Sequence, residues 1–164
     1  MRAAGRRQAG FTLLEVMVVL VIIAVVASLA TLSISVGDRT EVARTEASRL
    51  AALMELAGEE AVLNGENLGV GFTRTGYGFY RLQGDQWMAM AEDAMLRTRE
   101  LPAGLELVLD HKLSGDVEEG APVQVLLLAS GEQTAFSVDL EEEGHPLYRL
   151  SGNELGELTL ETVQ

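Results

Sequence analysis

A single carboxylate, Glu15, stands at the start of an apolar run near the N-terminus. No charged residue occurs from Val16 to Val36, and this stretch is long enough to cross a bilayer core as a helix, which takes about 20 residues. A carboxylate in hydrocarbon costs several kcal/mol unless it is compensated. Glu15 therefore requires a proton, a cationic partner or a position level with the lipid headgroups.

Other residues with ligating potential are few and are not spaced as a metal site requires. The two histidines, His111 and His145, fall in expected loops, and neither has a partner one helical turn away with which to share a metal ion. The acidic stretches Asp116–Glu119 and Glu141–Glu143 carry the oxygen ligands that calcium prefers. Neither has a recognisable ligand pattern, which favours a solvated acidic loop, and we expect no bound metal.

One glycine pattern, Gly69-Val70-Gly71, suggests a nucleotide-binding loop. Arg74 stands where the third glycine of a dinucleotide fingerprint belongs, and a strand rather than a helix is expected to follow. No phosphate-binding lysine motif and no nucleophile elbow occurs in the sequence. We therefore expect no cofactor, no small-molecule substrate and no enzyme activity.

The charge of the chain limits its partners further. The formal net charge is −13, and Arg2, Arg6 and Arg7 lie ahead of the apolar run, so the remaining chain is more acidic still. Such a surface repels phosphate backbones, which argues against nucleic acid. The chain has no cysteine, which excludes a disulfide framework and a thiolate metal site.

The arginines before the apolar run and Asp38 after it indicate a direction of insertion. The positive-inside rule leaves the N-terminus in the cytoplasm and carries the body across the membrane. Ser28-Leu29-Ala30 is a small-x-small triplet that a signal peptidase tolerates. A cleaved secretory signal and a simple signal anchor are therefore both open on charge and length, but neither explains Glu15.

The segment "AGFTLLE", Ala9 to Glu15, resembles the class III signal of type IV pilins and type II secretion pseudopilins. In that family, a prepilin peptidase cuts after the residue that matches Gly10 and methylates the new N-terminus, here Phe11. The resemblance implies that Glu15 becomes the fifth residue of the mature chain. There it would pair with the ammonium group of a neighbouring subunit or with its own, which offsets the cost of desolvation.

Beyond the membrane segment, residues 38–63 keep a helical pattern. Apolar residues recur at spacings of three and four, which predicts one buried stripe, and Asn64-Gly65 is a plausible stop. The stripe consists of Ala43, Ala47, Leu50, Met54, Ala57 and Ala61.

After Gly65, short β-type runs alternate with turn residues. We expect Val123–Leu128 to be a central strand buried on both faces, Gly156 to mark a bulge, and Met88–Arg97 to admit a helical turn. The expected strands are Leu68–Thr73, Gly78–Leu82, Gln86–Met90, Leu105–Asp110, Val123–Leu128, Ala135–Leu140, Leu147–Leu150 and Leu155–Thr162.

Three segments of the body resemble H-type minor pseudopilins, the GspH/FimT family: "LPAGLELVL", "LASGEQTAFSVDL" and "LSGNELGELTL". The resemblance implies an α+β, pilin-like fold, in which a long N-terminal transmembrane helix packs on an antiparallel β-sheet body, expected to be a two-sheet sandwich. The chain would divide into a prepilin leader (1–10), a transmembrane and assembly helix (11–36), the soluble half of that helix (37–65) and a periplasmic β-rich domain (66–164).

What this resemblance implies is a structural subunit of the type II secretion pseudopilus. It would be a single-pass inner-membrane protein with a cytoplasmic N-terminus and a periplasmic domain. Its expected partners are the I-, J- and K-type minor pseudopilins at the tip, the G-type major pseudopilin of the shaft, the prepilin peptidase and the inner-membrane assembly platform. Two alternatives remain: a FimT- or FimU-like minor pilin that primes type IV pilus assembly, and an exported soluble binding domain cleaved near Ala30.

Overall fold

The computed structural model describes residues 13–110 and 122–163, and for residues 26–38 it describes the backbone alone. The chain divides into two compact units, Met1–Thr40 and Glu41–Gln164, which are described separately below. One helix, α1 (Leu13–Asn64), supplies the described part of the first unit and the opening element of the second.

In the second unit, α1 buries the stripe that its apolar spacing predicts. All six stripe residues are at most 4% exposed, and Leu53 adds to them. The helix ends where the sequence predicts: Gly65 adopts a φ of 65°, and the backbone N–H of Glu66 donates to the Ala61 carbonyl at 3.1 Å. Glycine reaches this left-handed conformation without the steric cost of a side chain.

The first sheet follows the helix and contains five antiparallel strands. Its order is β3-β2-β1-β6, and β4 pairs with β2 beyond the end of β3. Both hairpin turns are short, at Arg74-Thr75 and Gly84-Asp85. The strands are β1 (Leu68–Thr73), β2 (Gly76–Gln83), β3 (Gln86–Ala89), β4 (Arg99–Glu100) and β6 (Val125–Leu127).

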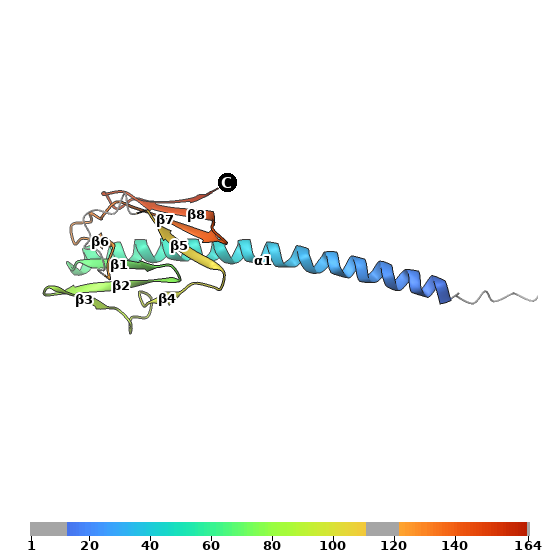
Figure 1. Ribbon diagram of the computed structural model, residues 1–164. Helices are drawn as coiled ribbons and strands as arrows, with labels where there is room; N and C mark the ends of the chain where they lie inside the picture. Colours follow the sequence, from blue (N-terminus) through green and yellow to red (C-terminus); the bar gives the residue numbers. More distant parts are fainter. Residues whose placement is uncertain (1–12, 111–121, 164) are drawn as a thin grey trace, which may run out of the picture. The chain divides into compact units, whose positions relative to one another are not determined.

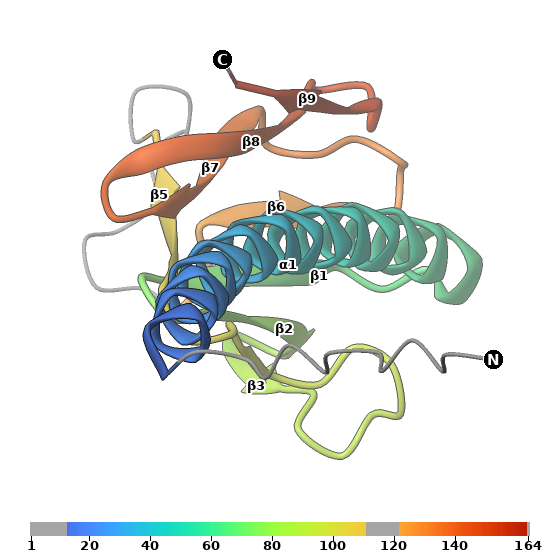
Figure 2. The ribbon, with the colours of Figure 1, turned by 90° about the vertical axis from the view of Figure 1, so that its right-hand side faces the viewer.

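The second sheet has four antiparallel strands in the order β5-β7-β8-β9. Figure 2 shows β9 at the outer end of this sheet. The register between β7 and β8 shifts at Leu140/Glu141, and that shift is a bulge. The strands are β5 (Leu105–Leu109), β7 (Phe136–Glu142), β8 (His145–Gly152) and β9 (Leu158–Thr162).

Helix and sheets share one hydrophobic core. Met54 of α1, Phe79 of the first sheet and Leu140 of the second belong to a single buried cluster. Figure 1 shows the second half of α1 running between β7 and β8 on one side and β1 and β2 on the other. The antiparallel α+β fold is therefore confirmed, and the helix completes a core that the two sheets do not close by themselves.

Two local predictions are wrong. β6 lies at the end of its sheet: Val125 and Leu127 face the core while Leu126 is half-buried, so the apolar run reflects one buried face plus partial cover of the other. Gly156, with a φ of 84°, lies in the turn between β8 and β9 and makes no bulge. The ambiguous stretch Met88–Arg97 contains one turn, in which the N–H of Asp93 donates to the Met90 carbonyl at 3.2 Å, and no regular helix.

The glycines of β1 serve close packing. A Cβ atom on Gly71 would lie 1.9 Å from the Pro122 carbonyl oxygen, and one on Gly69 would lie 2.5 Å from a methyl of Val123. The segment that enters β6 therefore crosses β1 at backbone distance. This packing explains the Gly-x-Gly pattern without a nucleotide.

Candidate functional site

The described part of the first unit is a helix that exposes large apolar side chains all round. From Leu13 to Val25 their exposed fractions range from 47% to 79%. Isolated exposed apolar residues are ordinary, but a contiguous apolar surface of this kind marks contact with a membrane or with other proteins. The exposed residues are Leu13, Leu14, Val16, Met17, Val18, Val19, Leu20, Val21, Ile22, Ile23 and Val25.

Glu15 lies in the first turn of this helix, and it is the single charged residue from Leu13 to Val25. A carboxylate is favoured at a helix N-terminus, where the backbone N–H groups carry a partial positive charge. Gly10 and Phe11, the predicted processing residues, lie outside the described residues. Within the described part of the chain, no helix is both long and apolar enough to cross a membrane. The assignment of residues 11–36 to a transmembrane helix stays a prediction.

The second unit contains a buried acid that the sequence reasoning missed. Glu46 is 4% exposed, and its Oε1 accepts a hydrogen bond from the hydroxyl of Tyr77 at 2.9 Å. Tyr77 is in β2, so this bond ties the helix to the first sheet. Burial, and then the nearby Glu46 carboxylate, raises the pKa of Tyr77 well above its usual range, which keeps the phenol protonated as a donor.

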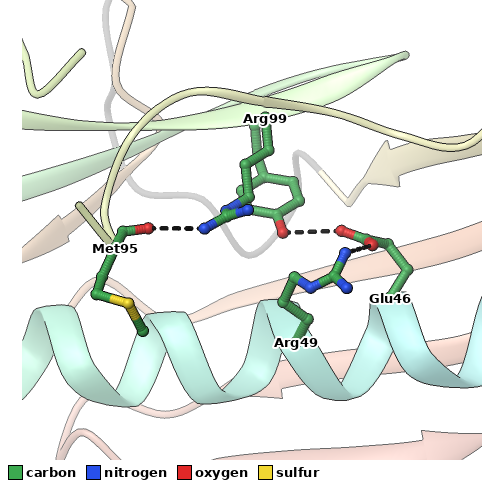
Figure 3. A network of polar contacts seen from close by, with 5 residues as sticks. Glu46, Arg49, Met95 and Arg99 are labelled. Atoms are coloured by element: carbon green, nitrogen blue, oxygen red, sulfur yellow. Dashed lines mark hydrogen bonds and ion pairs between the residues drawn. The ribbon is translucent and has the colours of Figure 1, made fainter. Parts of the chain in front are cut away.

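Two arginines complete this polar network (Figure 3). Arg49, one turn along α1, forms an ion pair with Oε2 of Glu46. Arg99 of β4 donates to the Met95 carbonyl at 3.2 Å, and its positive charge acts on the Tyr77 phenol. Since both oxygens of Glu46 are engaged, the buried charge is compensated within the body. The network fastens α1 to β2 and has no nucleophile or metal arrangement.

The position of Glu46 in the sequence does indicate that it is buried. It lies three residues after Ala43 and four before Leu50, at the spacing of the buried stripe. An acid at such a position requires a polar partner from another element. Its partner, Tyr77, is far away in the sequence, which is why the pattern of the helix alone did not identify the pair.

The other candidate ligands do not come together. His145 is exposed, and its Nδ1 lies 3.2 Å from the carbonyl oxygen of Glu143. His111 and the stretch Asp116–Glu119 lie outside the described residues. Among the residues that the structure describes, there is no group of three or more histidine or acidic side chains that could hold a metal ion.

Two family models match this chain. Residues 5–31 match the prokaryotic N-terminal methylation motif, and residues 46–156 match the type II transport protein GspH. The first match includes the predicted cleavage site and Glu15, and the second includes most of the β-rich body.

Known proteins agree with these matches. The Type II secretion system protein H of Pseudomonas aeruginosa is 33% identical over 85% of this chain and 86% of its own length. The crystal structure of the minor pseudopilin EpsH from the type II secretion system of Vibrio cholerae has a TM-score of 0.66 and 26% identity, covering 76% of this chain and 96% of that one. The type IV minor pilin FimU of Pseudomonas aeruginosa has a TM-score of 0.53, covering 76% of this chain and 90% of that one; at 19% identity, that likeness concerns the fold alone.

Proposed function

This chain belongs to the GspH family and is a minor pseudopilin of type II secretion, and from that premise we propose the roles of its N-terminal residues. Gly10 is the residue after which the prepilin peptidase cuts, Phe11 is the residue that is then methylated, and Glu15 directs assembly. The match of residues 5–31 to the methylation motif supports all three assignments.

The exposed apolar helix is the observation that carries the assembly role. Side chains from Leu13 to Val25 present an apolar surface all round, so the helix suits both lipid and the helices of other subunits. Cleavage after Gly10 would create an ammonium group four residues before Glu15. A neighbouring subunit at the correct height would bring its own ammonium group against this carboxylate, whereas a wrong stagger would leave a charge in apolar surroundings.

The location follows from the same features. We infer a membrane-anchored periplasmic protein with one membrane-spanning helix. The leader arginines stay in the cytoplasm and the unit from Glu41 onward lies in the periplasm. In the pseudopilus, the protein would join the I-, J- and K-type subunits at the tip and connect them to the G-type shaft. The prepilin peptidase and the assembly platform would act on it before incorporation.

Substitution in the leader tests the processing step. We expect Gly10→Ala to accumulate as an unprocessed precursor, because a side chain at the cleaved bond obstructs the peptidase. Gly5→Ala, which makes the same change five residues earlier in the same leader, should be processed normally. Immunoblots of membrane fractions separate the two forms by size. Normal cleavage of Gly10→Ala would show that the site is elsewhere.

A further inference from the structure

The outer edges of the two sheets differ in how far the chain itself covers them. β6 is bridged at Leu127 by Gln133, and on β5 the N–H of Leu107 donates to the Arg74 carbonyl at 2.9 Å. Within the described residues, no strand lies beyond β3 or β9. An open edge presents a row of backbone donors and acceptors to which another strand can pair.

The hydrogen-bond phase of β9 identifies which groups face outward. The N–H of Val163 donates to the Leu147 carbonyl at 2.9 Å, in line with the register that pairs Leu150 with Leu160. Bonded and non-bonded pairs alternate along an antiparallel ladder. The N–H and C=O groups of Leu158, Leu160 and Thr162 therefore point away from β8.

A groove of about 510 Å³ adjoins this edge. Its helix side is formed by Ser48, Ala51 and Ala52, whose small side chains leave space beside the strand. On the sheet side, Leu158 and Leu160 line it, and Leu160 remains 37% exposed. The apolar side chains of an added strand would enter this space at every second residue.

The charge of the groove limits what can occupy it. Glu55 and Glu157 line it, and its lining includes no lysine or arginine. A second copy of this chain would bring the same two carboxylates and a strongly acidic net charge to the contact, so self-pairing is repelled. The complementary occupant is a segment that carries a basic residue.

We propose that β9 is an acceptor for a strand from another subunit of the pseudopilus, an inference that rests on the function proposed above. The donated segment is extended, has apolar side chains at alternate positions, and places a lysine or arginine beside Glu55 and Glu157. Backbone hydrogen bonds to Leu158, Leu160 and Thr162 provide affinity, and the groove provides specificity.

Two substitutions at one position block this edge in different ways. Leu160→Pro removes an N–H group that points outward and leaves the hydrogen bonds to β8 intact. Proline is tolerated at such edge positions. Leu160→Lys keeps the backbone and places a charge in the groove, as natural edge strands do to prevent pairing.

Matched controls are available on the other open edge. The N–H of Met90 donates to the Phe79 carbonyl, and Ala89 pairs with Tyr80, so the N–H of Ala89 also points outward. Ala89→Pro therefore makes the same backbone change on β3. Met88→Lys introduces the same charge there, on a side chain that is 49% exposed.

The measurement is site-specific cross-linking in the secreting bacterium. The chain has no cysteine, so Thr159→Cys in the full-length protein gives one position on β9 for a maleimide-linked benzophenone. We expect one product, mapped by mass spectrometry to a segment of another pseudopilus subunit with alternating apolar residues and a basic residue. Adding Leu160→Pro or Leu160→Lys should lower its yield about tenfold, and the β3 controls should lower it less than about twofold.

Several results would overturn the proposal: no product, an unchanged yield with either Leu160 variant, or a product mapped to a second copy of this chain or to a segment without that pattern. Thermal unfolding of each variant accompanies the assay. If Leu160→Pro melts more than about 5 °C below the parent, the cross-linking yield of Leu160→Lys alone is used to test the proposal. The N-terminus is determined in the same samples, so a correctly processed chain that gives no product refutes strand addition and leaves the proposed function standing.

Discussion

Glu15 and Glu46 belong to the same helix and lie in opposite surroundings. Glu46 is buried in the second unit, where Tyr77 and Arg49 of the same body engage both of its oxygens. Glu15 is exposed in the first unit, among apolar side chains that are exposed as well. The surroundings of Glu46 are supplied by the fold of the chain itself. The exposed apolar surface around Glu15 is suited to contact with lipid or with other subunits. We therefore propose that Glu46 serves stability and that Glu15 serves assembly.

The largest effect is expected from Glu15→Leu. The variant should still insert in the membrane, because an apolar helix is sufficient for insertion. Its body should stay folded, because the second unit has its own hydrophobic core. Its incorporation into the pseudopilus should fall about tenfold or more, because the pairing with an ammonium group is lost. Secretion of an exported enzyme and recovery of the variant in sheared pseudopili measure this.

Glu41→Leu is the matched control for that experiment, because Glu41 is an exposed acid of the same helix that forms an ion pair with exposed Arg44. It should leave secretion unchanged. If Glu15→Leu also secretes normally, the division of roles between the two acids is wrong.

Glu46→Ala should affect the body instead. Removing the carboxylate leaves the Tyr77 hydroxyl without its buried acceptor and opens a small cavity, for an expected loss of about 3 kcal/mol of unfolding free energy. Denaturant unfolding of the purified protein measures the change. Glu41→Ala should shift stability by less than about 0.5 kcal/mol. Equal losses in the two variants would mean that the buried network contributes nothing particular.

Tyr77→Phe should have a smaller effect, about 1 kcal/mol, because the ring and its packing against Phe79 remain. The pH dependence gives a sharper signature. The folded pKa of Tyr77 is raised above the unfolded value of about 10, so its contribution is complete below pH 10 and is lost as the pH rises above that value. The decline in stability above about pH 10 should therefore be shallower in Tyr77→Phe.

Tyr148→Phe is the control for this experiment, since Tyr148 is a half-buried tyrosine of β8, in the other sheet from Tyr77. An identical alkaline profile in Tyr77→Phe and the parent protein would contradict the role of the phenol.

Local patterns were sufficient to predict most elements of the fold. The spacing from Ala43 to Ala61 predicted the buried face of α1, and Gly65 predicted its end. Seven of the eight expected strands overlap observed strands in their expected places, although β8 extends beyond both ends of the expected Leu147–Leu150. The eighth, Val123–Leu128, exists but is shorter and lies at an edge. The composition of a strand distinguishes its buried face from its exposed face, but it does not specify which other strands pair with that strand.

The features that the sequence did not predict depend on distant parts of the chain. β4 has two residues, too few to show the alternation of apolar and polar side chains that indicates a strand. It forms because it pairs with the free edge of β2. The Glu46–Tyr77 pair joins a helix to a strand of the following sheet. For the N-terminal site the situation is reversed: Gly10, Phe11 and Glu15 form a continuous motif, so their assignment came from local sequence.

The mass of the mature N-terminal peptide tests the central claim most directly. The protein is purified from membranes of its own bacterium and the peptide is sequenced by mass spectrometry. The account predicts a chain that begins at Phe11 with a methylated amino group. A chain that retains Arg6 and Arg7, or one that begins at Thr31, would contradict it.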